Sequence, residues 1–193
     1  ADMEPILAVA NRYGLKVIED SAETMFASYN GQRVGSIGDI GCFSTYVAHL
    51  LVTGVGGICT TSDPEYAVHI RSLINHGRDS IYISIDDDKD MSEEELNMVV
   101  ARRFNFVRPG HSFRVTEMEA ALGLAQLEES TNMISTRRAN ARSLIRKLDS
   151  LDSFIQLPKT RPGSEHSFMM FPIVLTDMRK VKLVNFLEQN GVE

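Results

Sequence analysis

The stretch "DIGCFSTYVAHLLVTGVGGICTT" occupies residues 39–61 and holds two short apolar runs separated by a glycine-rich turn. The runs at 40–45 and 56–62 are rich in β-branched, aromatic and small residues, so they predict two strands. Between them lie a single histidine, His49, and the small-residue run "TGVGG". The segment therefore predicts a strand, a loop that carries a histidine, and a second strand entered through a glycine-rich hairpin.

Outside this stretch, helical and strand patterns alternate along the chain. Apolar residues at helical spacing predict helices over residues 3–14, 63–77, 116–130, 135–151 and 178–191, the fourth with its arginines on the solvent-exposed face. Short apolar runs predict further strands over residues 15–20 and 167–175. This alternation favours an α/β sandwich with a largely parallel sheet.

Two helix starts have specific capping signals. Asp63 precedes Pro64, which predicts an N-cap followed by a proline at the first helical position, and the same helix is expected to end at Gly77. Thr116 and Glu119 have the spacing of a capping box.

Composition indicates an ordinary globular protein and argues against several classes of partner. The chain has 193 residues, 43% of them apolar, and a formal charge of −6 from 20 basic and 26 acidic residues. A net acidic chain without a basic cluster argues against nucleic acid and anionic membranes as partners. The acidic run at 85–96 is predicted to be a solvated loop that leads into a helix. No apolar run approaches a membrane span and no signal-peptide pattern is present, so a cytoplasmic protein is expected.

The chain has two cysteines, Cys42 and Cys59, both within apolar strand-like runs. This placement predicts buried free thiols in a reducing compartment rather than a disulfide.

Residues able to carry chemistry follow two of the predicted strands. Asp20 and Glu23 lie at the end of the run at 15–20, and Ser44 lies five residues before His49. In open α/β sheets such strand ends form ligand sites, and hydroxyl groups beside a glycine-rich turn suit a phosphate. Each residue also fits an ordinary role: Asp20 as a turn cap, Ser44 as a strand residue, His49 as a structural histidine. Taken one at a time, these residues leave both interpretations open.

In order along the chain, "VIEDSAE", "GQRVGSIGDIGCFSTYVAHLLVTGVGG", "INHGRD" and "PGHSFRVTEMEAALGLAQLE" resemble the pyridoxal-phosphate-dependent nucleotide-sugar aminotransferases of the DegT/DnrJ/EryC1/StrS type. The resemblance implies an α/β/α sandwich of the aspartate-aminotransferase type (fold type I), covers about the middle half of a family chain, and implies a homodimer. Residues 1–127 would be the carboxyl-terminal part of the large cofactor-binding domain. Residues 128–193 would be the connecting helix and a truncated small domain.

The resemblance also implies roles for individual residues. Asp20 matches the aspartate that pairs with the pyridine nitrogen, where a carboxylate keeps the ring protonated and able to accept electrons. Glu23 falls where the family usually has Gln or His against the ring hydroxyl, and Ser44 falls on the phosphate-binding serine. His49 falls on the lysine that holds the cofactor covalently. No other lysine can take that position, because the sequence has none between Lys16 and Lys89.

A histidine in place of this lysine resembles the deoxygenating branch of the family, the 3-dehydratases that act on 4-keto-6-deoxy nucleotide sugars such as GDP-4-keto-6-deoxymannose. An ordinary imidazole has a pKa of about 6.5, so it can act as a base near neutral pH. The branch implies pyridoxamine phosphate as the reacting form of the cofactor, glutamate as the amino donor and loss of the C3 hydroxyl as water. The alternatives are a catalytically altered or regulatory member that binds the cofactor without turnover, and transamination through an unusual base.

Cysteine usage and three substitutions refine this expectation. Iron–sulfur members of the branch need four thiolates, and this chain has only two cysteines, so neither an iron–sulfur cluster nor another metal is expected. Val55 stands where the family usually has Glu, and His111 and Ser112 stand where Tyr and Asn are usual. Asn at the latter position reaches the partner subunit's phosphate, and Ser112 can donate a hydrogen bond there with shorter reach.

Overall fold

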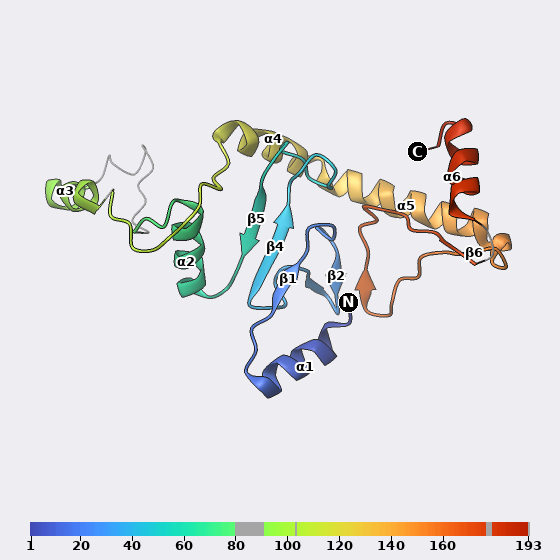
Figure 1. Cartoon of the computed structure of the whole chain (residues 1–193), viewed down its shortest axis with the longest axis horizontal. Coiled ribbons are helices and arrows are strands. Elements are labelled where there is room, and N and C mark those ends of the chain that lie inside the picture. The colour runs from blue at the N-terminus through green and yellow to red at the C-terminus, as the bar shows by residue number, and fades with distance from the viewer. Residues whose placement is uncertain (80–90, 103, 177–178, 193) are drawn as a thin grey trace.

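The computed structural model describes residues 1–79, 91–102, 104–176 and 179–192. Helices and strands are mixed along the chain (Figure 1). In order, the elements are α1 (Met3–Tyr13), β1 (Ile18–Asp20), β2 (Ser28–Tyr29), β3 (Gln32–Arg33), β4 (Ile40–Ser44), β5 (Gly57–Thr60), α2 (Pro64–Ile74), α3 (Glu93–Arg102), α4 (Glu117–Glu128), α5 (Ser130–Leu148), the 3-10 turn η2 (Asp149–Leu151), β6 (Ile155–Gln156), β7 (Ser164–Glu165), β8 (Val174–Leu175) and α6 (Lys180–Gln189).

The sheet that positions the candidate site has the strand order β1-β4-β5. β1 and β4 are parallel, with Asp20 opposite Cys42, whereas β4 and β5 are antiparallel, with Ser44 opposite Gly57. The carboxyl ends of β1 and β4 therefore lie at the same edge of the sheet (Figure 1). The sheet is less parallel than expected: of the strand pairs within the described residues, only β1–β4 is parallel. The connection from β4 to β5 contains no crossover helix, and a short connection of this kind joins antiparallel strands.

A buried carboxylate holds the turn between β3 and β4 against β1. Glu19 is 8% exposed and accepts hydrogen bonds from the backbone N–H groups of Gly35 (2.8 Å), Ile37 (2.7 Å) and Gly38 (2.7 Å). Gly41 packs directly on this turn, since an added Cβ would lie 2.3 Å from the Cα atom of Gly35. The close packing fixes β4 beside β1.

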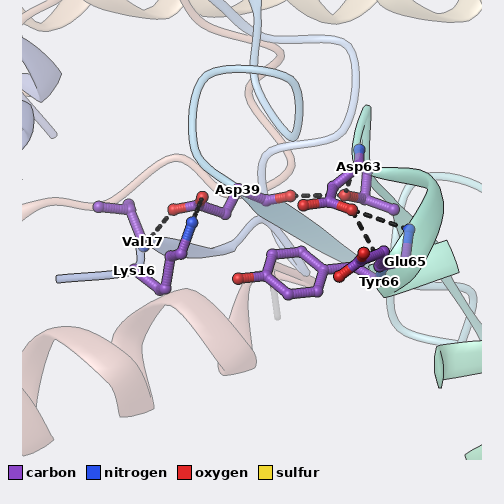
Figure 2. Close-up of polar contacts among 7 residues, drawn as sticks. Lys16, Val17, Asp39, Asp63, Glu65 and Tyr66 are labelled. Atoms are coloured by element: carbon purple, nitrogen blue, oxygen red, sulfur yellow. Dashed lines mark hydrogen bonds and ion pairs between the residues drawn. The ribbon is translucent and has the colours of Figure 1, made fainter. Parts of the chain in front are cut away.

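A second polar network ties the opposite edge of the sheet together (Figure 2). The Asp39 carboxylate, just before β4, pairs with Lys16 Nζ at 3.0 Å and accepts the Val17 N–H at 2.8 Å. The Asp39 carbonyl accepts the Thr61 hydroxyl at 2.7 Å, and Thr61 Oγ1 accepts the Asp63 N–H at 3.1 Å. The start of β1, the start of β4 and the entry to α2 are thereby joined.

Replacing Asp39 with Asn is expected to reduce the loss of folding stability that occurs when the pH is lowered from 7 to 3. The Val17 N–H and then Lys16 hold the pKa of Asp39 below its usual value. A lowered folded-state pKa gives a stabilising contribution that is present above about pH 4 and is lost as the pH falls through the folded-state value. Thermal unfolding at pH 7 and pH 3 should show a smaller loss of stability for Asp39→Asn than for the wild type. An equal loss in both proteins would contradict this role.

The predicted helices are confirmed, with changes at their ends. Asp63 caps α2, and Thr116 and Glu119 form the capping box of α4. α2 ends at Ile74 rather than at Gly77, which has a φ of 74° and lies against the Arg108 carbonyl. The helix predicted over 135–151 begins earlier, at Ser130, so that only one residue separates α5 from α4.

Two predictions along the carboxyl-terminal third are wrong in part. Within 167–175 only Val174–Leu175 forms a strand, β8. The arginines of α5 do not all face solvent: Arg137 donates to the carbonyls of Phe168 (3.2 Å) and Met169 (3.3 Å). Phe168 has a φ of 52°, which is incompatible with a continuous strand.

Two other expectations from the sequence concern the acidic run and the cysteines. Residues 85–90 of the acidic run lie outside the described residues, and α3 begins just after them at Glu93. Both cysteines are free thiols, but Cys42 is only half-buried and Cys59 is exposed, so the prediction that both are buried is wrong. In the described part of the chain, no helix is long and apolar enough to span a bilayer.

Candidate active site

Asp20 is the last residue of β1, and its side chain is exposed at the carboxyl edge of the sheet. Its Oδ1 atom accepts the Ala22 N–H at 3.3 Å. The N–H of the next residue, Ser21, donates to the Cys42 carbonyl at 2.8 Å and so extends the pairing of β1 with β4. Asp20 also lines a cavity of about 490 Å³, together with His166 and other residues. The carboxylate thus makes a weak turn contact and remains accessible to a ligand.

Ser44 ends the neighbouring strand at the same edge. Its Oγ atom accepts the Tyr46 N–H at 3.3 Å, so the hydroxyl proton can still be donated to a ligand. The adjacent Thr45 is buried, and its hydroxyl lies 2.7 Å from that of Thr53. The Thr53 N–H donates to the Thr45 carbonyl at 2.9 Å. These contacts close the base of the loop that carries His49.

The loop at 45–56 is anchored to the hydrophobic core and to α4. Leu50 and Leu51 are 3% and 6% exposed and pack with Met25 and Ile134. Val52 is held at both backbone groups by one side chain: its N–H donates to Gln126 Oε1 at 3.0 Å, and its carbonyl accepts from Gln126 Nε2. Residues 50–52 are therefore fixed, and His49 directly precedes this anchored segment.

His49 follows a turn in which its N–H donates to the Tyr46 carbonyl at 2.9 Å. The two rings meet edge to face, with centroids 6.2 Å apart and planes at 67°. Nδ1 of His49 is buried and has no hydrogen-bond partner among the described residues. Because buried side-chain nitrogens are normally paired, this atom lacks the partner that a purely structural histidine would have.

Ser112 lies beside the end of α2, opposite Asn75. It is exposed, pairs with Asn75 in an isolated bridge, and lines two cavities of about 860 and 780 Å³. Arg71 and Arg114 line both cavities and give them positive charge. The lining residues of these two cavities do not include Asp20, Ser44 or His49. The structure thus brings Asp20, Ser44 and the start of the His49 loop to one edge, whereas Ser112 shares a cavity with Val55, Gly56 and Gly57 at the end of that loop.

Three substituted positions are accessible. Glu23 is exposed and makes no hydrogen bond or ion pair within the described residues. Val55 is 62% exposed beside the glycine-rich turn. His111 stacks on Phe113, with ring centroids 4.7 Å apart.

Sequence reasoning missed the residues that support the site. Gln126 and Thr53 fix the loop, Glu19 fixes the neighbouring turn, and Arg71 and Arg114 line the cavities beside Ser112. An acid within the short run at 15–20, directly before Asp20, was a detectable signal for Glu19. The pairing of Gln126 with Val52 joins residues 74 positions apart and leaves no local pattern.

The whole chain, residues 1–193, matches the family model described as the DegT/DnrJ/EryC1/StrS aminotransferase family. This chain belongs to that family. The family and the fold class implied by the motifs are thereby confirmed.

Individual DegT/DnrJ/EryC1/StrS proteins give the same result. GDP-perosamine synthase of Caulobacter vibrioides is 32% identical, over 100% of this chain and 47% of its own. GDP-4-keto-6-deoxy-D-mannose 3-dehydratase of Yersinia pseudotuberculosis is 29% identical, over 100% of this chain and 48% of its own. The structure of E. coli GDP-4-keto-6-deoxy-D-mannose-3-dehydratase with bound hydrated PLP aligns with a TM-score of 0.83 at 24% identity, over 100% of this chain and 49% of that one. The chain spans about half the length of the curated relatives it matches.

The residues at the carboxyl edge suit pyridoxal phosphate, the cofactor found in that neighbouring structure. Asp20 offers an exposed carboxylate for a protonated ring nitrogen, and Ser44 offers a hydroxyl for the phosphate. The unpaired, buried Nδ1 of His49 provides a polar atom on the loop between them and the glycine-rich turn. No amine is available on this loop, because the chain has no lysine from 17 to 88.

Borohydride treatment of the intact protein with pyridoxal phosphate is expected to leave the peptide that contains residues 44–57 unmodified. Reduction fixes the cofactor only where a lysine holds it covalently, and this peptide has none. Mass spectrometry of the digested protein gives the result, and an aminotransferase relative with the lysine serves as the positive control. A reduced cofactor adduct within 44–57 would show that the match of His49 to the family lysine is wrong.

Proposed function

We propose that the protein containing this chain removes the C3 hydroxyl group from a 4-keto-6-deoxy nucleotide sugar, with pyridoxal or pyridoxamine phosphate as cofactor and His49 as the base. The observation that carries the proposal is the imidazole of His49, placed on an anchored loop with an unpaired Nδ1 where family aminotransferases have lysine. Similarity to the Yersinia 3-dehydratase, a protein named for this reaction, supports it.

The cofactor would be held by residues at the carboxyl edge. When bound, pyridoxamine phosphate supplies an amino group for the C4 ketone and a ring that accepts electrons. Asp20 keeps the ring nitrogen protonated, and the Ser44 hydroxyl donates to the phosphate. Glu23, three residues after Asp20, is exposed and can contact the ring hydroxyl. These contacts replace the covalent hold of a lysine with hydrogen bonds and charge.

His49 would move the proton. The neutral imidazole accepts a proton from the methylene carbon of the cofactor amine. The resulting imidazolium then carries the proton that the C3 hydroxyl needs in order to leave as water. Leu50, Leu51 and Gln126 hold the loop in place before the substrate binds. The reaction therefore does not have to supply the entropy cost of positioning the imidazole.

The proposal includes three partners. The substrate is a nucleotide-linked keto sugar, glutamate restores the amino group of the cofactor, and a second copy of the protein completes the site. Ser112 lies in cavities separate from Asp20, which suits a residue that contributes to the partner subunit's phosphate site.

The direct test incubates the intact protein with GDP-4-keto-6-deoxymannose, pyridoxal phosphate and glutamate, and follows ammonia and the 3-deoxy sugar. Equal amounts of ammonia and 3-deoxy product are expected. Formation of a 4-amino sugar instead would indicate transamination and contradict the proposal.

A second candidate is a regulatory or catalytically altered member that binds the cofactor without turnover. The exposed Val55 and Ser112, both departures from the family pattern at phosphate-binding segments, are the observations that favour it. Spectroscopic binding of pyridoxamine phosphate together with no product from any 4-keto sugar would support this candidate.

A further inference from the structure

Cys42 and Cys59 lie directly opposite each other on the antiparallel strands β4 and β5. Side chains of directly opposite residues point to the same face of a sheet. Within residues 1–193 there is no other cysteine, so each thiol has one counterpart in this segment.

The hydrogen-bond pattern of these strands places the two cysteines close together. The Thr45 N–H donates to the Gly56 carbonyl at 3.1 Å, so 45 and 56 form a hydrogen-bonded pair. Such pairs alternate with non-hydrogen-bonded pairs along antiparallel strands. Cys42 lies three positions before Thr45 on β4, and Cys59 lies three positions after Gly56 on β5. By this alternation, Cys42 and Cys59 form a non-hydrogen-bonded pair. The Cα atoms of such a pair are about 4.5 Å apart, within the range of about 4.4–6.8 Å that disulfides require.

The surroundings of the two thiols differ in a way that suits stepwise oxidation. Cys59 is exposed and can be reached by a soluble oxidant, whereas Cys42 is half-buried beside it. Burial, and then the charge and hydrogen bonding of the neighbouring Cys59 thiol, raise the pKa of Cys42. Cys59 is thus suited to react first and Cys42 to react with it.

We propose that Cys42 and Cys59 form a reversible disulfide that ties β4 to β5 at the root of the His49 loop. The closed ring would contain the whole segment at 43–58, including Ser44 and the glycine-rich turn. The inference rests on the strand register and on the exposure of Cys59, and it holds whether or not His49 is a base.

Oxidised glutathione provides a balanced reaction for this bridge. The Cys59 thiolate attacks the glutathione disulfide, whose S–S bond breaks and releases one glutathione thiolate, which takes up a proton. The Cys42 thiol then loses its proton and attacks the Cys59 sulfur, which releases the second glutathione. The two cysteines give up two electrons, and one glutathione disulfide becomes two glutathione thiols.

The test treats the native, intact protein with oxidised glutathione, then denatures it, alkylates it with iodoacetamide and digests it without reduction. Mass spectrometry should find the peptides containing Cys42 and Cys59 joined, with neither cysteine alkylated. Dithiothreitol added before alkylation should separate the peptides and make both cysteines reactive. The control variant Cys59→Ser, altered at an exposed side chain, should give no joined peptide and an alkylated Cys42.

Three results would overturn the proposal. The first is alkylation of both cysteines after treatment with the oxidant. The second is a lasting glutathione adduct on Cys59 with Cys42 still reduced, and the third is a joined peptide that forms only in denaturant. The last result would show that the native strands hold the sulfurs in the wrong geometry.

Discussion

The His49→Asn variant is expected to lose at least about a hundredfold in formation of 3-deoxy sugar while it keeps its affinity for pyridoxamine phosphate. General base catalysis typically contributes about 10²- to 10⁴-fold, and the asparagine amide cannot accept the proton. The fold should be unaffected, because Leu50 and Leu51, not His49, hold the loop on the core. Product formation and cofactor absorbance, measured on the same samples, separate loss of chemistry from loss of binding.

A matched variant distinguishes the base from a general requirement for a polar residue. His49→Lys restores an amine at this position, so it should allow a covalent hold on the cofactor and shift the protein toward transamination. Glu23 and Ser112 also differ from the aminotransferase pattern, so full aminotransferase activity is not expected. Undiminished 3-deoxy product from His49→Asn would rule out His49 as the base.

The Asp20→Asn variant is expected to lose roughly a hundredfold or more in turnover with little change in stability. An uncharged amide no longer keeps the pyridine nitrogen protonated, and loss of one electrostatic contact in an active site commonly costs about 10²- to 10³-fold. Stability should be retained, because Asp20 is exposed and the side-chain carbonyl oxygen of the introduced asparagine can still accept the Ala22 N–H.

Turnover and the thermal unfolding midpoint should both be measured for Asp20→Asn and for the control Glu19→Gln. Glu19 is buried and accepts three backbone N–H groups, so its variant should mainly lose stability. Wild-type turnover in Asp20→Asn would show that Asp20 is only a turn residue.

Local signals in the sequence predicted the parts of the fold that depend on a few neighbouring residues. The Asp63 cap, the capping box of Thr116 and Glu119, and the strand predicted over 40–45, which is Ile40–Ser44 in the structure, are confirmed, because their cause lies within a few positions. The irregular path of 167–173 was not predicted. This path depends on tertiary contacts, such as those of Arg137 with the carbonyls of 168 and 169.

The candidate site also contains residues marked by local sequence signals and residues that only the folded structure reveals. Strand ends singled out Asp20, Ser44 and His49 as candidates, and the family resemblance implied their roles. The parallel pairing of β1 with β4 brings the ends of those two strands to a common edge. Gln126 and Thr53 act only through the folded loop, so no sequence pattern marked them. The facing cysteines became apparent only from the register of β4 and β5.

The most direct measurement follows the proton that His49 is proposed to remove. The intact protein is mixed with the 4-keto sugar and with pyridoxamine phosphate that carries deuterium at its methylene carbon, and mass spectrometry follows release of the label into water. The wild type should release deuterium from one of the two methylene positions only when the sugar is present, and His49→Asn should release almost none. Equal release from the wild type and His49→Asn would contradict the assignment of His49 as the base.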